Sequence, residues 1–156
     1  MSHAYDLERF VDAQNADGTY VRAVDELRRG RKTSHWMWFV FPQISGLGVS
    51  GMSRRFSISS LAEARAYFRH PILGPRLVEC AQLVIAVQGK TVYDILGSPD
   101  DLKFRSCMTL FSRAAEDPGV FGQALNKYFS GEPDALTLER ILELGDQGTG
   151  QEFGGR

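Results

Sequence analysis

Histidine, cysteine and long apolar runs are scarce in this sequence, and each scarcity excludes a class of protein. The chain has three histidines and two cysteines among 156 residues, and their scattered positions do not match the spacing of a metal site. The longest uninterrupted apolar run is Trp36 to Phe41, far short of the roughly 20 residues that a membrane-spanning helix needs. We therefore expect no metal site and no insertion into a membrane.

An excess of charge of either sign is also missing. Lysine and arginine total 18 and the acidic residues 19, for a net charge of -1, so there is no general attraction to nucleic acid or anionic lipid. Nucleic acid is accordingly not expected as a partner. The amino terminus lacks the basic and apolar regions of a secretion signal, which predicts a cytoplasmic protein. Cys80 and Cys107 both lie in apolar helical contexts, and we expect them to be reduced, buried thiols.

The common catalytic and cofactor motifs are absent as well. The sequence contains no glycine-rich phosphate loop, no dinucleotide fingerprint, no histidine pair at metal spacing and no nucleophile elbow. No cofactor is therefore expected.

Signals for helices, in contrast, recur along the whole chain. Ser60 precedes Glu63 at the spacing of a capping box, and apolar residues recur at three- and four-residue steps over 73–87. Ser98 as the N-cap, with Pro99 at the first helical position, predicts a long helix after residue 98, and Asp134 is placed to start a later one. Strand signals are few and lack alternating partners.

These patterns predict an all-α fold of about seven helices. We expect one globular domain over residues 1–144, with a loop-rich segment near 42–60 that contains Pro42 and several glycines. Residues 145–156 are glycine-rich and polar, which predicts a flexible tail.

Both tryptophans fall in one short segment, "SHWMWFVFPQISGLGVS", and two interpretations of it stay open. Large aromatic side chains most often serve a core, in which case His35 is an ordinary structural histidine. Alternatively, the segment lines a pocket whose flat walls suit a planar or sugar-bearing ligand. The residues of such a pocket would be His35 as the candidate catalytic group, with Trp36, Trp38 and Gln43 as ligand contacts.

A second set of candidate residues follows Pro99. Lys103, Ser106 and Thr109 recur at helical spacing, which places them in a polar stripe on the predicted long helix. Any amphipathic helix has such a side, but a lysine followed by small hydroxyls would also suit an anion or a phosphate.

A basic cluster flanks the tryptophan segment. Helix ends often carry arginine and lysine because the dipole favours them there, so a solvated face is the simpler explanation. The alternative is a patch that contacts phosphate beside stacking aromatics. The cluster consists of Arg28, Arg29, Arg31, Lys32, Arg54 and Arg55.

Two long stretches resemble a known family. "SHWMWFVFPQISGLGVSGMSRRFSISSLAEARAYFRHPILGPRL" and "ILGSPDDLKFRSCMTLF" are similar to the uncharacterised bacterial family called domain of unknown function 1810, which sometimes carries a calpastatin label. The resemblance implies a mainly α-helical single domain and supplies no activity. It also implies serine where Cys107 stands here, which argues against this cysteine as a required nucleophile. The calpastatin label finds no support, since that inhibitor class resembles disordered repeats.

Three hypotheses on function follow. The first is a site for a small molecule of the nucleotide or ribosyl type, with tryptophan walls, His35 for proton transfer and Lys103 with Ser106 for an anion. The second is a non-enzymatic adaptor that presents the 42–60 segment, with its arginines, to a protein or nucleic acid. The third is a purely structural role for the tryptophans. Convergence of His35, Gln43 and Lys103 in one concavity would favour the first, whereas oligomeric state is not indicated by the sequence.

Overall fold

The computed structural model describes the backbone of residues 5–154 and the side chains of residues 5–144, and it confirms the all-α prediction. The short helices α3, α4 and α7 raise the number of helices above the seven expected, and α4 lies inside the segment predicted to be loop-rich. The helices are α1 (Glu8–Asn15), the 3-10 helix η1 (Ala16–Gly18), α2 (Thr19–Arg28), α3 (Met37–Val40), α4 (Gly51–Arg55), α5 (Leu61–Arg69), α6 (Leu73–Ala86), α7 (Val92–Leu96), α8 (Asp100–Ala114), α9 (Gly119–Phe129) and α10 (Ala135–Gly154).

Local capping explains where several helices begin. The Ser60 hydroxyl accepts a hydrogen bond from the Glu63 N–H at 3.2 Å, which is one half of the predicted capping box. The other half is absent, because the Glu63 carboxylate accepts from the Ser59 N–H at 2.7 Å. The Asp134 carboxylate accepts from the Thr137 N–H at 2.9 Å at the start of α10. The predicted start of α8 is wrong by one residue, because Pro99 occupies the N-cap position and the helix begins at Asp100.

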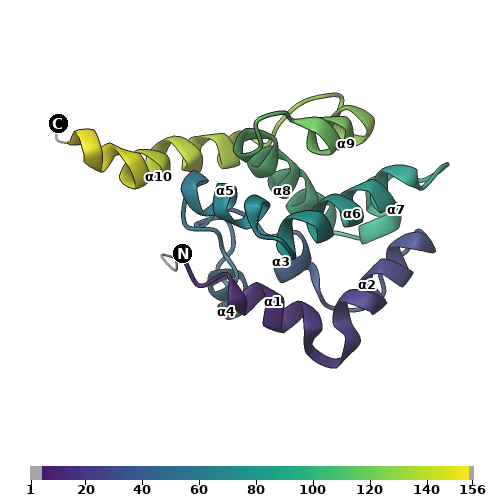
Figure 1. The fold of residues 1–156 in the computed structure, drawn as a ribbon. Coiled ribbons are helices and arrows are strands. Elements are labelled where there is room, and N and C mark those ends of the chain that lie inside the picture. Colours follow the sequence, from purple (N-terminus) through teal and green to yellow (C-terminus); the bar gives the residue numbers. More distant parts are fainter. Residues whose placement is uncertain (1–4, 155–156) are drawn as a thin grey trace.

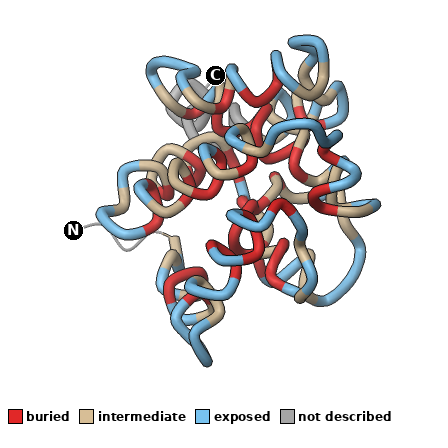
Figure 2. The backbone as a smooth tube through the Cα atoms, turned by 90° about the vertical axis from the view of Figure 1, so that its right-hand side faces the viewer, coloured by how far each residue is buried: buried red, intermediate tan, exposed pale blue. Residues whose placement is uncertain are grey.

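The long helices pack in the centre of the molecule around one apolar cluster. Helix α8 packs against α5, α7, α9 and α10, and α6 packs against α2, α5 and α9. Figure 1 shows α6 and α8 in the middle, α1 and α2 on one side, and α10 projecting from the body. The buried stretches face this interior, and the exposed ones form the outer turns and loops (Figure 2).

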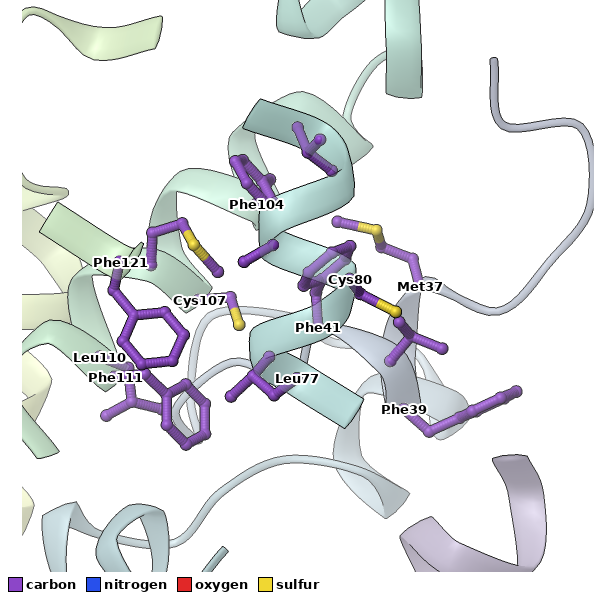
Figure 3. Close-up of a cluster of buried hydrophobic side chains, with 14 of the residues drawn as sticks. Met37, Phe39, Phe41, Leu77, Cys80, Phe104, Cys107, Leu110, Phe111 and Phe121 are labelled. Carbon is purple, nitrogen blue, oxygen red and sulfur yellow. The ribbon is translucent and has the colours of Figure 1, made fainter. Parts of the chain in front are cut away.

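Aromatic rings and both thiols fill the centre of the apolar cluster (Figure 3). Phe41 from the tryptophan segment meets Phe104 of α8 edge to face, with their ring centroids 5.0 Å apart. Cys80 and Cys107 are free and buried, as predicted. Burial raises the pKa of Cys80 to about 12 and that of Cys107 well above its usual range, so neither thiol is an available nucleophile at neutral pH.

The loop-rich segment near 42–60 is pinned at its base by a single bridge. Ile44 and Ile58 form an isolated parallel bridge, the sole β-type pairing within residues 5–154. The Ile58 N–H donates to the Gln43 carbonyl and the Ser45 N–H to the Ile58 carbonyl, both at 2.8 Å. The segment therefore leaves the core and returns to it at one point, with α4 in between.

Helix α10 runs into the glycine-rich segment that the sequence predicted to be a flexible tail. The side chains of residues 145–156 lie outside the described part of the chain. Both the mobility of this tail and the domain boundary at residue 144 stay predictions. Among the described residues, no helix combines the length and hydropathy that crossing a membrane requires.

Candidate functional site

A polar hollow opens where α3, the 42–57 segment and α8 meet. Its empty space is ≈ 390 Å³ when open solvent is included, whereas the space that water-sized spheres can occupy is ≈ 30 Å³. The hollow is therefore small. Its lining consists of Met37, Trp38, Phe41, Gln43, Ile44, Ser45, Gly46, Gly48, Ser53, Arg54, Phe56, Ser57 and Lys103.

The loop that forms one wall of the hollow is held from behind by two arginines. Arg9 of α1 donates to the carbonyls of Arg55 at 2.8 Å and Ser57 at 2.7 Å. Arg140 of α10 donates to the Ser45 carbonyl at 2.9 Å. Because these donors fix the backbone on both sides of α4, a ligand would meet a wall that is already ordered.

Two glycines permit the tight course of this wall. Gly46 has φ +99°, and a Cβ there would lie 2.5 Å from the Nε atom of Arg140. A Cβ on Gly48 would lie 2.5 Å from the Ser53 hydroxyl oxygen. Side chains at these positions would displace the arginine that holds the loop or the serine that faces the hollow.

Trp38 and Lys103 meet at the hollow, as the small-molecule hypothesis requires. The Lys103 ammonium lies 5.5 Å from the centroid of the half-buried Trp38 ring. The Lys103 Nζ atom lies 3.8 Å from the Oδ1 atom of Asp100, which is longer than a hydrogen bond. The other oxygen of this carboxylate, Oδ2, binds the Lys32 ammonium at 2.9 Å. Lys103 therefore has a carboxylate nearby but makes no hydrogen bond to it.

The charge of the hollow is positive. Lys103 and Arg54 are lining residues, and neither aspartate nor glutamate occurs in the lining within the described part of the chain. Hydroxyls of Ser45, Ser53 and Ser57 and the half-buried Gln43 supply further polar groups. This combination of cations and neutral donors without a carboxylate suits an anionic ligand.

Trp36 has a different environment from Trp38. It is completely buried, and its indole N–H donates to the Glu26 carboxylate at 2.9 Å. It is absent from the lining of the hollow, so the structure places this ligand-contact candidate in the core. The expectation that a buried indole finds a polar partner is met by Glu26.

The Glu26 carboxylate accepts hydrogen bonds from several residues at the start of the tryptophan segment. Burial acts to raise the pKa of Glu26, but donors from Ser34, Thr33 and Trp36 outweigh it and lower the pKa to about 2. The Ser34 hydroxyl lies at 2.5 Å and the Thr33 N–H at 2.9 Å. Glu26 thereby fixes the backbone that leads into α3 and the hollow.

We expect Glu26→Gln to lower the free energy of unfolding at pH 7 by on the order of 2 kcal/mol, after allowance for solvent screening. The folded-state pKa lies below the unfolded value, so the wild-type carboxylate stabilises the fold above pH 4.5, and this contribution is lost as the pH falls toward 2. Urea denaturation at pH 7, 4.5 and 3 should show the difference between the two proteins shrink with acidity.

The control is Asp25→Asn, which removes an exposed carboxylate from the same helix. Asp25 pairs only with the exposed Arg29 at 3.1 Å, so the change should stay within about 0.5 kcal/mol. Equal losses for both variants would show that Glu26 has no special role.

The remaining candidate residues lie away from the hollow. His35 is exposed and does not line it. The Thr109 hydroxyl accepts from the Asp134 N–H at 2.9 Å, and the Ser106 hydroxyl lies 3.3 Å from the Asp134 carboxylate. Ser106 and Thr109 thus support the start of α10. Of the three residues whose convergence was to be tested, Gln43 and Lys103 meet at the hollow and His35 does not.

The sequence also carried residues of the hollow that were not selected as ligand contacts. Ser45, Ser53 and Ser57 were missed, and Arg54 was noted only within the basic cluster and the adaptor hypothesis. Their recurrence among glycines in "SGLGVSGMSRRFS" was a usable signal, because serine, arginine and glycine are common where a loop contacts an anion. Within the described residues, no group of three or more histidine, cysteine or acidic side chains is placed to hold a metal ion.

The protein is all-α and has a hollow lined by two cationic side chains. The chain belongs to the family described as "Protein of unknown function (DUF1810)", whose model matches residues 4–141. It is also similar to a conserved hypothetical protein from Mycobacterium tuberculosis of known crystal structure, with 51% sequence identity and a TM-score of 0.86. The match covers 89% of this chain and 98% of that one. The comparison with curated proteins gave no match.

Proposed function

We propose that the hollow binds a small anionic molecule that carries a flat ring, of the nucleotide or ribosyl type. The observation behind this proposal is the meeting of Trp38, Gln43 and Lys103 around a concavity whose described lining has no carboxylate. The ring would stack on the half-buried indole of Trp38, and the anionic part would bind Lys103 and Arg54. Both cysteines are free thiols, which is typical of a reducing compartment, so the ligand would be a cytoplasmic metabolite.

The described lining favours binding over catalysis. It contains serines and Lys103 but no histidine, cysteine, aspartate or glutamate, so a serine nucleophile would have no histidine or carboxylate base beside it. Lys103 beside Trp38 would serve as an electrostatic contact in this role.

We expect Trp38→Ala and Lys103→Met each to weaken binding roughly tenfold or more. Stacking on an aromatic side chain contributes roughly 1–3 kcal/mol per base, and a charge-assisted hydrogen bond contributes about 1.5–3 kcal/mol. Thermal shift with adenosine 5′-monophosphate, adenosine diphosphate, ADP-ribose and ribose 5-phosphate would find a ligand, and calorimetry would compare the variants.

Arg113→Met is the matched control for the loss of a cation. Arg113 is exposed in the last turn of α8, ten residues beyond Lys103, which places it roughly 15 Å along the helix. Its replacement should leave the affinity unchanged. A folded wild-type protein that is stabilised by no member of the series would contradict the proposal.

The adaptor hypothesis rests on the outer side of the same segment. Val49 is 83% exposed, and Arg54 and Arg55 are exposed as well. If the segment docks a partner, a Val49→Ser, Arg55→Ala double variant should lose partner binding. The wild-type protein should then show no binding in the small-molecule titrations. Ligand binding that survives in this double variant but is lost in Lys103→Met would favour the hollow.

A further inference from the structure

The hollow as a whole is too small for a ring. The space in it that water-sized spheres can occupy is ≈ 30 Å³, enough for two or three waters, since each needs roughly 10–15 Å³ on this measure. A flat ring must therefore remain at the mouth beside Trp38, which is half-buried there. The three terminal oxygens of a phosphoryl group, in contrast, would take the places of about the same number of waters.

Hydrogen-bond donors remain available around the hollow. The Ser53 hydroxyl oxygen accepts from the Ser50 hydroxyl at 3.0 Å, which leaves the hydrogen of Ser53 free to donate. The Lys103 ammonium lies 3.8 Å from Asp100 and 5.5 Å from the centroid of the Trp38 ring, and neither contact is a hydrogen bond. Since a terminal phosphoryl group accepts through three oxygens, such donors match its needs.

The charges favour a dianion over a monoanion. Lys103 and Arg54 contribute two positive charges to the lining. The nearest carboxylate, Asp100, is shared with Lys32 at the shorter distance of 2.9 Å. A phosphate monoester carries nearly two negative charges at neutral pH, whereas a diester carries one.

From this geometry we infer that the hollow selects a terminal phosphate monoester as its dianion, with the ring of the ligand outside against Trp38. The inference rests on the proposed function and specifies its ligand class. A diester would have to bring a second substituent into a hollow that holds only a few waters.

Binding should then follow the ionisation of the ligand. The charged groups around the hollow are Lys103 and Asp100 of α8, Arg54 of α4, the Arg140–Glu143 pair of α10 and the Arg9–Glu63 pair behind the loop. No histidine belongs to the described lining, and histidine is the side chain that ordinarily changes charge between pH 5 and 8. We therefore expect the affinity to depend on pH through the second ionisation of the phosphate, near pH 6.

The test compares three adenosine compounds by calorimetry at pH 5.0 and 7.5, with circular dichroism to verify the fold at each pH. Adenosine 5′-monophosphate should bind about tenfold more tightly at pH 7.5, because the dianionic fraction rises from roughly one tenth to nearly one. Adenosine 3′,5′-cyclic monophosphate, a diester, should bind more weakly and without this dependence. Adenosine should bind most weakly of the three.

Each other outcome overturns a distinct part of the argument. Equal, pH-independent binding of the monoester and the cyclic diester, with adenosine weaker, would overturn the monoester inference and leave the proposed function standing. Equal binding of adenosine would overturn any role for an anion. Absence of binding by all three to the folded protein would overturn both proposals.

Substitutions in the lining test whether the preference for the monoester arises in the hollow. Lys103→Met and Ser53→Ala should each reduce the preference for the monoester over adenosine, whereas Arg113→Met should retain it together with its pH dependence. An unchanged preference in folded Lys103→Met and Ser53→Ala would place the phosphate elsewhere and overturn the inference.

Discussion

Replacing Trp36 with alanine is expected to lower the free energy of unfolding by roughly 3–5 kcal/mol, the usual cost of truncating a large buried aromatic side chain. Trp36 is completely buried, its ring lies 6.3 Å from that of Phe41, and its N–H binds Glu26 at 2.9 Å. The substitution removes both the packing and the donor, so Glu26 would keep a buried oxygen with one partner fewer.

The matched comparison is Trp38→Ala, two residues along the chain. Trp38 is only half-buried and has one face near Lys103. Its removal should therefore cost much less stability and should weaken the binding of the ligand. Chemical denaturation of both variants beside the wild type gives the two free energies. Similar losses in both would contradict the assignment of one tryptophan to the core and the other to the hollow.

Gly74→Ala is expected to destabilise the protein by about 3 kcal/mol, in the upper part of the range for overpacking. Gly74 lies near the start of α6, and a Cβ there would lie 2.0 Å from the carbonyl oxygen of Phe68 in α5. Because the obstacle is backbone, the two helices would have to separate. Urea denaturation measures the loss.

Gly51→Ala serves as the control for this substitution. A Cβ on Gly51 meets nothing within 4 Å, and the residue begins α4. Alanine there should leave stability unchanged or raise it slightly, because it restricts the unfolded chain. A loss equal to that of Gly74→Ala would mean that the contact between α5 and α6 is not the cause.

Much of the fold could be predicted because its signals are local. Ser60 caps α5 by accepting a hydrogen bond from Glu63, three positions away. The apolar residues that recur over 73–87 likewise predict α6 from neighbouring residues alone. The short helices α4 and α7 carry no comparable pattern. They were missed because five residues are too few for a periodicity to show.

The site was predicted only in part, for a related reason. Trp38, Gln43 and Lys103 were selected for their chemistry, and they meet because α8 packs beside α3 and the loop. Trp36 was chosen on the same chemistry but lies in the core, since neighbouring residues of a short turn face different directions. Arg140 escaped notice because it contacts Ser45 across 95 positions of sequence.

The sequence by itself determined that the chain would be helical and which helices would be long, because capping and periodicity act over three or four residues. Tertiary structure alone decided that Trp38 faces Lys103 while Trp36 faces Glu26. It also decided that two distant arginines would hold the serine-rich wall of a hollow. These contacts join segments far apart in the chain, and they depend on the directions in which packed helices present their side chains.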